Sequence, residues 1–415
     1  MKFGFSDKKC GILGEHLAHS FSPLIHSFLG DYSYDICEVD PKDLESFLKN
    51  NDLDAFNVTI PYKKAVIPYL DFVSIEAMSI GAVNLVIKKD GKLWGYNTDY
   101  FGFEYMVNAS GVNIEGKKVI VFGTGGAAVT ICALLKAHKA GEIVSIGIEN
   151  NNRQFVSQHS DASVIVNATP VGMYPNNRKA VTDISLFPAL EAVLDIVYNP
   201  TRTEIMLQAE EKNIPAIGGL SMLVAQAAKG AEIFTGEKFD SDIIEKTIAK
   251  IALMTENIIL IGMPSSGKSS IGRVLASKLG RNFFDADEEF EKMHGISPAT
   301  AIKDLGEPKF RDMEAEVIAK LGKESETIIA TGGGVVTRDE NYHSLHQNGK
   351  IILIERDLDK LSTEGRPLSQ ANSLQSLYES RKNAYFKFAD ITICNNTTIE
   401  EAADKIISSL ERYSK

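Results

Sequence analysis

The stretch NIILIGMPSSGKSSIGRVLASKLG, residues 257–280, decides the fold of the second half of the chain. Its first five residues are mostly apolar and predict a buried strand, and its last twelve have apolar residues at helical spacing. Between them, Gly262, Gly267, Lys268 and Ser269 match G-x-x-x-x-G-K-[ST] without a gap. Such a loop turns backbone N–H groups toward phosphate oxygens at a helix N-terminus. The stretch therefore predicts a phosphate-binding loop between a strand and a helix.

The polar residues of this loop have distinct predicted roles. Lys268 would reach the β- and γ-phosphates, and the Ser269 hydroxyl would coordinate Mg²⁺. Ser270 is a further predicted ATP-binding residue. We therefore expect ATP and Mg²⁺ as cofactors. The alternative is a loop that binds an anion without transferring a phosphoryl group.

The same strand–loop–helix plan occurs earlier, in KKVIVFGTGGAAVTICALLKAH, residues 117–138. Gly123, Gly125, Gly126 and Ala127 follow a predicted strand at 118–122 and open a helix, which is the context of a dinucleotide-binding loop. Further short apolar runs alternate with helical patterns, which predicts α/β architecture with mostly parallel sheets. The expected fold is an α/β substrate domain with a Rossmann-like dinucleotide domain, followed by a P-loop domain of the nucleoside-monophosphate-kinase type.

The two halves meet without a linker of Gly, Pro or Ser. Ile243, Ile244, Ile248 and Ile251 have helical spacing, and the strand at residue 257 begins six residues later. We expect a boundary near residues 253–256. We predict a substrate-binding domain at residues 1–105, which helices at residues 220–253 complete. A Rossmann-like domain is predicted at residues 106–219 and a P-loop domain at residues 254–415.

Composition limits the other functions of the chain. The formal net charge is −11 over 415 residues, which argues against broad binding to nucleic acid or anionic membranes. No apolar run approaches the roughly 18 residues of a membrane span, and the first residues lack a secretory pattern. The four cysteines are scattered, without metal-ligand spacing. We expect a cytoplasmic enzyme with small-molecule substrates. The enzyme could form a homo-oligomer.

Polar residues after the P-loop could form one substrate site. Asp285 and Asp287 lie at a predicted strand end, where one could hold Mg²⁺ through water and the other could meet a substrate hydroxyl. Alone, the pair would be more typical of a solvated acidic turn. The accompanying groups are Arg311 with Glu314 on a helix, Gly332, Gly333 and Gly334 after a strand, Arg366 in a loop, and Arg381 with Tyr385 on a helix.

These motifs, in this order, make residues 256–415 resemble shikimate kinases. The resemblance implies that Asp287 contacts the reacting hydroxyl, as a base or an orienting group, and that Arg366 closes over the phosphates. The metal would lie near Ser269 and Asp285. The lid segment at residues 357–370 is shorter than is usual in that family, which leaves the adenine contacts open. The implied substrate-binding residues are Asp287, Arg311, Gly333, Gly334 and Arg381.

Seven short motifs in the first half are weak singly and specific together. Ser-x-Ser before Pro is more often a helix cap, and a single lysine is usually solvated. The motifs, each with the number of its first residue, are S-x-S-P (20), N-V-T-x-P-x-K (57), G-A-V-N (81), N-T-D (97), N-A-T-P-x-G-M (167), Y-N-P (198) and G-L-x-M-L-x-x-Q (219). Residues 5–250 thereby resemble shikimate dehydrogenases. The implied substrate-binding residues are Ser20, Ser22, Thr59, Asn84, Asp99, Tyr198 and Gln226.

The resemblance makes Lys63 and Asp99 the catalytic pair, and the chemistry suits them. Reduction of a ketone needs a hydride on carbon and a proton on oxygen. A lysine beside the carbonyl can donate that proton and stabilise the developing alkoxide, while Asp99 holds the ammonium in place.

The cofactor preference stays open between NADP and NAD. Relatives place an Asn-Arg-Thr motif after the second strand of the dinucleotide domain, where this chain has IGIENNNRQF. Glu149 would favour the free ribose of NAD, whereas Arg153 could reach a 2′-phosphate. NADP(H) is our first expectation, from the family. About 13 residues separate Glu149 from the strand at Ser163, so we expect a rebuilt adenosine side. Gly219 and Met222 complete the predicted cofactor site.

The resulting hypothesis is a bifunctional enzyme of aromatic amino acid (chorismate) biosynthesis. It would reduce 3-dehydroshikimate to shikimate and then phosphorylate shikimate with MgATP. One alternative is an NAD-dependent quinate/shikimate dehydrogenase fused to the kinase. Ser22 argues against it, because a bulkier Thr at this position would be the mark of quinate use. Another is a catalytically silent dehydrogenase-like half that only binds shikimate or supports the kinase.

Overall fold

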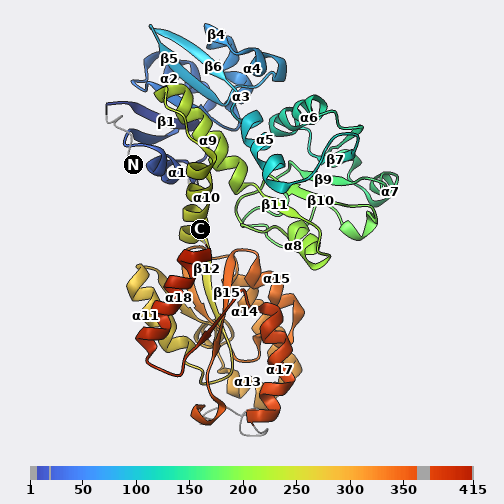
Figure 1. The fold of residues 1–415 in the computed structure, drawn as a ribbon, viewed down its shortest axis with the longest axis vertical. Coiled ribbons are helices and arrows are strands. Elements are labelled where there is room, and N and C mark those ends of the chain that lie inside the picture. The colour runs from blue at the N-terminus through green and yellow to red at the C-terminus, as the bar shows by residue number, and fades with distance from the viewer. Residues whose placement is uncertain (1–6, 18–19, 362–373, 414–415) are drawn as a thin grey trace. The chain divides into compact units, whose positions relative to one another are not determined.

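The computed structural model describes residues 7–17, 20–361 and 374–413. The chain forms two compact units. The first unit comprises residues 1–171, 180–198 and 208–251, and the second comprises residues 172–179, 199–207 and 252–415. Figure 1 labels their helices and strands. No helix among the described residues is long and apolar enough to cross a membrane.

The first unit begins with a mixed six-stranded sheet in the order β2-β1-β3-β5-β6-β4. Strands β1, β2 and β3 are parallel, while β5 is antiparallel to β3 and β6. A two-residue turn joins β5 to β6, and both turn residues, Asp90 and Gly91, have positive φ, as a tight hairpin requires. The strands are β1 Lys9–Gly14, β2 Ser33–Glu38, β3 Ala55–Val58, β4 Phe72–Val73, β5 Leu85–Lys89 and β6 Lys92–Tyr96.

Two groups of helices accompany the strands of this sheet in the first unit. Its buried strands pack with residues of α2, α3 and α4 in one hydrophobic cluster. Helices α5 and α9 contact each other extensively and carry the predicted substrate residues Asp99 and Gln226. The helices and turns are α1 Ser22–Leu29, η1 Pro41–Asp43, α2 Leu44–Asn50, α3 Tyr62–Ala65, η2 Ile67–Tyr69, α4 Ile75–Ile80, α5 Asp99–Ser110, α9 Leu220–Thr235 and α10 Ser241–Thr255.

The second sheet of this unit is fully parallel, in the order β11-β10-β9-β7-β8. The predicted strand at 118–122 and the helix after the glycine loop are confirmed as β7 and α6. Continuous buried runs in β7, β9 and β10 suit a sheet covered on both faces. The elements are β7 Lys118–Phe122, α6 Gly126–Ala137, β8 Glu142–Ile146, η3 Ile148–Asn150, α7 Arg153–Ser157, β9 Val164–Asn167, η4 Ile184–Leu186, β10 Ala192–Asp195, α8 Glu204–Glu211 and β11 Ala216–Gly218.

The connection from β8 to β9 is short. It contains only η3 and the five-residue helix α7, and β8 is an edge strand of the described sheet. The short stretch between Glu149 and β9 is thus too short for a further strand and helix, and the connection adds no strand to the sheet beyond β8.

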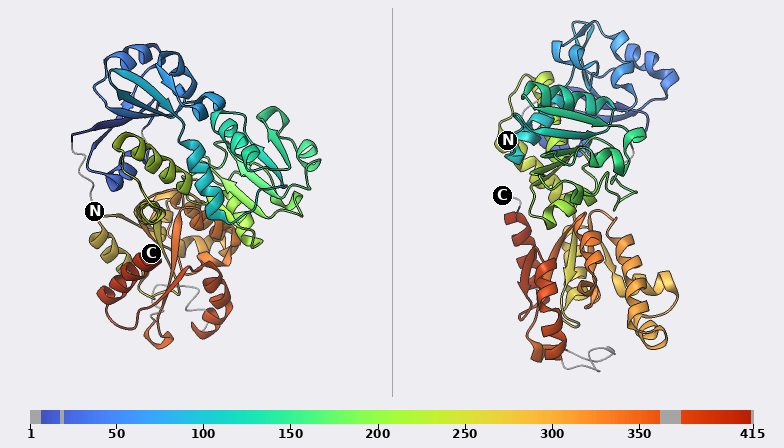
Figure 2. Two further views of the ribbon diagram at one scale, coloured as in Figure 1. Left: turned by 45° about the horizontal axis from the view of Figure 1, so that its top comes forward. Right: turned by 90° about the vertical axis from the view of Figure 1, so that its right-hand side faces the viewer.

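The second unit is built on a third parallel sheet, in the order β13-β14-β12-β15-β16. Helices α11 and α18 pack on one face and α12–α15 with α17 on the other, as two hydrophobic clusters and Figures 1 and 2 show. This three-layer arrangement confirms the predicted parallel α/β unit. The strands are β12 Asn257–Ile261, β13 Asn282–Asp285, β14 Thr327–Ala330, β15 Gly349–Glu355 and β16 Ile391–Cys394, and the helices and turns are α11 Lys268–Leu279, α12 Ala286–His294, α13 Pro298–Leu305, α14 Glu307–Leu321, η5 Val335–Thr337, α15 Asp339–His346, η6 Leu358–Lys360, α17 Leu374–Phe388 and α18 Ile399–Tyr413.

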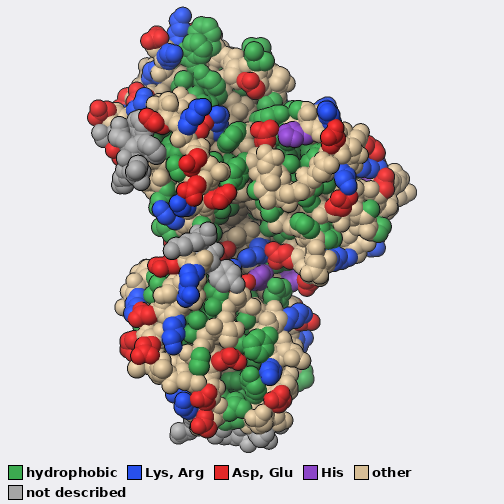
Figure 3. Space-filling view, in the orientation of Figure 1, with side chains coloured by type: hydrophobic (Ala, Val, Ile, Leu, Met, Phe, Trp, Pro, Cys, Tyr) green, Lys and Arg blue, Asp and Glu red, His purple; other side chains and the backbone are tan. Residues whose placement is uncertain are grey.

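The predicted helix at the seam is confirmed as α10, and β12 begins at Asn257, two residues after it ends. The division into four domain segments stays a prediction. Charged side chains of both signs are interspersed on the face drawn in Figure 3, as expected for the composition.

Candidate active sites

The catalytic pair predicted for the first unit forms an ion pair. Lys63, on the short helix α3, donates from Nζ to Asp99 Oδ2 at 2.6 Å. Asp99 is the first residue of α5, and its side chain is 10% exposed while that of Lys63 is 21% exposed. Two residues 36 positions apart therefore meet at a partly buried point, where the ammonium is held but still reachable.

Amide and hydroxyl groups surround Asp99. Asn84 Nδ2 lies 2.9 Å from Asp99 Oδ1 and 3.2 Å from Gln226 Oε1. The Thr98 hydroxyl donates to the same Gln226 oxygen at 3.2 Å, and the Thr98 N–H donates to Asn84 Oδ1 at 2.6 Å. The structure thus gathers four of the predicted residues, Lys63, Asp99, Asn84 and Gln226, around one network.

The predicted serines lie at the start of α1. Ser20 Oγ accepts a hydrogen bond from the Ser22 N–H at 3.3 Å, and Ser22 is buried at the first position of the helix. The N-cap itself is Phe21, whose side chain makes no cap. The Phe21 ring lies 5.3 Å from the Tyr198 ring, between centroids, so Tyr198 comes close to the serine segment. Thr59 directly follows β3.

A buried polar chain supports this site from behind. Tyr34 donates to Asn57 Oδ1 at 2.7 Å, and Asn57 donates to the Asn84 carbonyl at 3.3 Å. His26 stacks on Tyr34 with centroids 3.9 Å apart and pairs with Tyr32. Burial lowers the pKa of His26 to about 3, so this histidine is neutral at pH 7. It packs as a neutral ring between its aromatic neighbours Tyr32 and Tyr34.

The dinucleotide loop has room for a ligand. Gly123 has a φ of +122°, and a side chain there would clash with the Ala168 carbonyl. Gly125 and Gly126, by contrast, have open space where a Cβ would point, directly at the start of the twelve-residue helix α6. The loop therefore fits a pyrophosphate group approaching the helix N-terminus. Ala127 is the second residue of α6.

Residues that could read the adenosine ribose lie on the short β8–β9 connection. The Glu149 carboxylate folds back over Gly147, just beyond the end of β8. Arg153 is the first residue of α7 and is exposed. On the nicotinamide side, Gly219 packs against the Ile196 carbonyl and precedes α9, which carries the buried Met222.

The P-loop of the second unit connects β12 with α11, as predicted. Lys268 is buried and donates to the carbonyl oxygens of Gly262 and Met263 at 3.0 and 2.9 Å. The hydroxyl of Ser266 is buried without a hydrogen-bond partner among the described residues. A phosphate oxygen could accept a hydrogen bond from this hydroxyl, so the loop fits a nucleoside triphosphate. Ser270 follows Ser269 in the first turn of α11.

Asp285 and Asp287 do not share a strand end, so that part of the prediction is wrong. Strand β13 ends at Asp285, whose carboxylate caps α12 by accepting from the Asp287 N–H at 3.0 Å. Asp287 is in the first turn of that helix. Ser269 donates to Asp285 Oδ2 at 2.6 Å. This hydroxyl–carboxylate pair beside the P-loop has the oxygen donors that Mg²⁺ prefers.

The glycines after β14 form the meeting point of the predicted substrate residues. Arg381 and Tyr385, on α17, both donate to the Gly333 carbonyl, Arg381 at 3.0 Å. Arg311 pairs with Glu314 at 2.7 Å, and its guanidinium lies against Gly334. All four of these side chains are buried.

Two carboxyl groups face Gly332 in the same region. A Cβ built on Gly332 would lie 3.3 Å from Asp287 Oδ1 and 2.7 Å from Glu314 Oε1. Burial raises the pKa of Glu314, Arg311 opposes that shift, and the nearby Asp287 adds to it. The cluster therefore offers two buried guanidinium groups for an anionic substrate and one carboxylate, Asp287, for a hydroxyl.

Gly334→Ala is predicted to raise the KM for a carboxylate-bearing phosphoryl acceptor about tenfold, because the added methyl group would displace the Arg311 guanidinium. The KM for ATP should stay within about twofold. Steady-state kinetics with each substrate varied in turn measures both values. An unchanged acceptor KM would show that Arg311 does not bind the acceptor.

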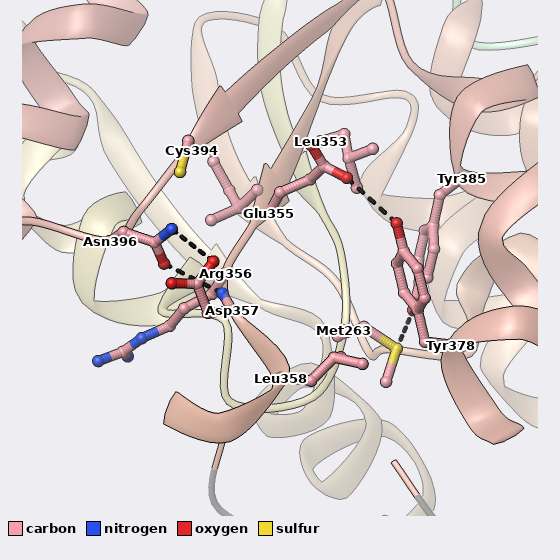
Figure 4. A pocket seen from close by; sticks show the side chains of 11 residues that line it. Met263, Leu353, Glu355, Arg356, Asp357, Leu358, Tyr378, Tyr385, Cys394 and Asn396 are labelled. Carbon is pink, nitrogen blue, oxygen red and sulfur yellow. Dashed lines mark hydrogen bonds between the residues drawn. The ribbon is translucent and has the colours of Figure 1, made fainter. Parts of the chain in front are cut away.

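A cavity of about 350 Å³ adjoins this cluster, and Figure 4 shows its lining. Tyr385 and Met263 meet at its edge, where Tyr385 contacts the Met263 sulfur at 3.8 Å. Its other side is formed by the end of β15 and by Asn396, which pairs with Asp357. Arg366, the predicted lid residue, lies outside the described residues.

Two supporting residues were given no role from the sequence. Thr98 lies inside the N-T-D motif and links Asn84 to Gln226, so its motif was a usable signal. Asn395 follows β16 and donates to the Ser266 carbonyl of the P-loop at 2.7 Å from 129 residues away. Within the described part of the chain, no group of three His, Cys, Asp or Glu residues could hold a metal ion by itself.

Comparison with family models gives one match in each half of the chain. Residues 12–86 match the shikimate dehydrogenase substrate binding domain, and residues 264–411 match shikimate kinase. The shikimate dehydrogenase (NADP(+)) of Clostridium perfringens strain 13 is 38% identical over 262 residues, which cover 58% of this chain and 96% of that protein.

Solved structures show the same relationship. Shikimate 5-dehydrogenase of Thermus thermophilus, in complex with NADP(H) and shikimate, is 30% identical, with a TM-score of 0.54 over 59% of this chain and 99% of its own. A chorismate mutase/shikimate 5-dehydrogenase fusion protein of Clostridium acetobutylicum is also 30% identical, with a TM-score of 0.54 over 59% of this chain and 97% of its own. The chain therefore belongs to the shikimate dehydrogenase family, and it carries a shikimate kinase domain after its dehydrogenase segment.

Proposed function

We propose that this chain catalyses two consecutive reactions of aromatic biosynthesis: reduction of 3-dehydroshikimate to shikimate, and phosphorylation of the shikimate 3-hydroxyl. One observation carries the proposal. The chain holds both a Lys63–Asp99 ion pair within an amide and hydroxyl network and a P-loop beside two buried arginines. The product of the first site has the carboxylate and hydroxyl groups that the second site is built to bind.

In the dehydrogenase site, Lys63 donates a proton to the carbonyl oxygen of the substrate as that oxygen gains negative charge. Asp99 fixes the ammonium at 2.6 Å, and Asn84 in turn fixes Asp99. Ser20, Ser22, Thr59, Tyr198 and Gln226 are the remaining proposed substrate contacts. A nicotinamide cofactor, when bound, supplies the hydride.

In the kinase site, Arg311 and Arg381 bind the acceptor carboxylate, since guanidinium groups suit bidentate carboxylate recognition. Gly333 and Gly334 provide backbone contacts to the ring. Asp287 accepts a hydrogen bond from the attacking hydroxyl, orients it toward the P-loop and takes its proton as the new oxygen–phosphorus bond forms.

The cofactors follow from these sites. The open space at Gly125 and Gly126 suits a dinucleotide, and the relatives' dependence on NADP favours NADP(H). The unpartnered Ser266 hydroxyl and the buried Lys268 suit ATP. We assign Mg²⁺ to the Ser269–Asp285 pair. A cytoplasmic location and a possible homo-oligomer remain predictions.

The preference between NADP and NAD has a specific structural basis. The relative from Clostridium perfringens is named as an NADP(+) enzyme, but Glu149 lies just beyond β8, where a carboxylate favours the free ribose of NAD. Arg153, on the exposed start of α7, is the candidate contact for a 2′-phosphate. We propose NADP(H) as the first cofactor and expect a smaller discrimination against NAD than a dedicated phosphate-binding motif would give.

The test measures shikimate-dependent reduction of NADP⁺ and NAD⁺ separately from shikimate-dependent release of ADP. We expect both activities, with kcat/KM higher for NADP⁺. A higher kcat/KM for NAD⁺, together with oxidation of quinate, would favour the quinate/shikimate alternative. ADP release without nicotinamide reduction would favour a silent dehydrogenase half and contradict the proposal.

A further inference from the structure

Strand β10 ends in a buried carboxylate that the proposed reactions do not use. Asp195 is the last residue of β10 and is fully buried, and it lies opposite Asn167, the last residue of β9. Asn167 Nδ2 donates to both Asp195 oxygens at 3.0 Å, and the Val197 N–H donates to Asp195 Oδ1 at 2.9 Å. Burial of a carboxylate is costly unless donors surround it, and these hydrogen bonds meet that requirement.

Asn167 connects this carboxylate to the turn that follows β9. Its Oδ1 accepts from the Thr169 N–H at 3.0 Å and from the Thr169 hydroxyl at 2.7 Å. The same hydroxyl oxygen accepts from the Val171 N–H at 3.1 Å, and Asn167 Nδ2 donates to the Val171 carbonyl at 3.2 Å. The Asn167 side chain therefore closes residues 168–171 into one turn, which we call the β9 turn.

The charge of Asp195 determines which way the Asn167 amide points. An ionised carboxylate only accepts hydrogen bonds, so the NH₂ group of Asn167 has to face it, and Asn167 Oδ1 is left for Thr169. If an amide replaced the carboxylate, both side chains could donate, and the Asn167 amide could turn round. Its NH₂ group would then face the Thr169 N–H, and the β9 turn would lose that hydrogen bond.

The β9 turn lies at the edge of the sheet where a dinucleotide is expected to bind. The strand order β11-β10-β9-β7-β8 places β8 on one side of β7 and β9 on the other (Figure 1). In open parallel sheets, ligands bind in the crevice beyond the carboxyl ends of two such strands. Here the crevice lies between the glycine loop after β7 and the β9 turn, where a side chain on Gly123 would clash with the Ala168 carbonyl. The β9 turn therefore forms one wall of the cofactor crevice.

We propose that Asp195 is a positioning residue for the nicotinamide cofactor. It orients Asn167, which fixes the β9 turn before the cofactor binds. Binding is weaker when a wall of the site has to be ordered first, because that ordering costs conformational entropy. Asp195 acts through Asn167 and Thr169 rather than by contact with the cofactor. The proposal rests on the proposed dehydrogenase function and assigns a role to a residue outside the seven motifs.

The first test is Asp195→Asn in the full chain, which keeps the size of the side chain but adds a donor that faces Asn167. We expect the KM for NADP⁺ in shikimate oxidation to rise about tenfold, because the β9 turn loses its fixed conformation. The dissociation constant of NADPH, from titration of its fluorescence, should rise by the same factor. The KM for shikimate should stay within about twofold of wild type.

Val193→Ala is the matched control for a general loss of stability. Val193 is fully buried in β10, two residues before Asp195, so its truncation lowers the thermal unfolding midpoint without removing a hydrogen bond of the β9 turn. Its KM for NADP⁺ and its NADPH dissociation constant should stay within about twofold of wild type. Equal rises in Val193→Ala and Asp195→Asn would overturn the proposal.

A double-mutant cycle tests whether Asp195 acts through the β9 turn. Thr169→Val keeps the shape of the side chain but removes the hydroxyl that joins Asn167 Oδ1 to the Val171 N–H, and it should itself raise the NADPH dissociation constant about tenfold. In this background, Asp195→Asn should raise the constant by less than about twofold. A tenfold rise in both backgrounds, or no rise in either, would contradict the proposal. If Asp195→Asn does not fold, Thr169→Val decides alone, and an unchanged constant overturns the proposal.

The proposal and the proposed function fail in different ways. Absence of shikimate oxidation in the wild-type chain would contradict the dehydrogenase function. The NADPH titrations do not depend on turnover, so they would still decide the role of Asp195. A wild-type chain that binds no NADPH would overturn both.

Discussion

Lys63→Ala is expected to lower the kcat for 3-dehydroshikimate reduction about 10³-fold while changing the KM for shikimate less than about threefold. The reason is that Lys63 interacts most strongly with the carbonyl oxygen when that oxygen takes up charge, whereas the neighbouring serines, amides and Tyr198 bind the ground state. The ion pair with Asp99 holds the ammonium at 2.6 Å before the substrate arrives, so its orientation is set in advance. Initial-rate measurements of both parameters at saturating cofactor provide the test.

The matched control is Lys64→Ala, because Lys64 is the adjacent residue of the same helix and is exposed. Its kcat should stay within about twofold of wild type. Equal losses in kcat and in shikimate affinity for Lys63→Ala would contradict an acid–base role and leave Lys63 as a binding residue only.

Asp287→Asn is expected to lower the kcat of shikimate phosphorylation about 10²- to 10³-fold, with little change in the KM for ATP. The carboxylate faces Gly332 beside the buried Glu314 and two arginines, at the point where the acceptor hydroxyl would lie. An asparagine keeps the size of the side chain but cannot accept a proton. Coupled measurement of ADP release, with ATP and shikimate varied in turn, gives both parameters.

Glu288→Gln serves as the comparison variant, because Glu288 is the next residue of α12 and forms an exposed pair with Arg273. It should retain more than half of the wild-type kcat. The dehydrogenase activity of Asp287→Asn should equal that of wild type, which shows that the fold is intact. A kcat for Asp287→Asn close to the wild-type value would remove Asp287 from the reaction.

The sequence predicted those parts of the structure that local patterns encode. The strand at 118–122, the helix with Arg381 and Tyr385 on one face, and the i, i+3 contact of Arg311 with Glu314 are all confirmed. In each case the periodicity of buried residues, or the turn of a helix, determines which side chains are neighbours.

Contacts made by tertiary packing could not be predicted in this way. Asp287 was expected at a strand end, but the Asp285 carboxylate starts a helix by capping it, and the two carboxylates separate into different elements. Asn395, which follows β16, supports the P-loop from 129 residues away, and no local pattern marks that contact. Likewise, the pairing of Glu204 with His343 depends on a packing of segments 139 residues apart.

The measurement that tests the central claim most directly is product analysis of one reaction containing the full chain, 3-dehydroshikimate, NADPH and MgATP. We predict shikimate 3-phosphate as the product, with one ADP released for each NADPH oxidised. Asp287→Asn should stop the sequence at shikimate. Lys63→Ala should give almost no product until shikimate is added, and then form shikimate 3-phosphate at the wild-type rate. Oxidation of NADPH without any shikimate 3-phosphate, or ADP release that does not depend on shikimate, would contradict the claim that one chain carries both reactions.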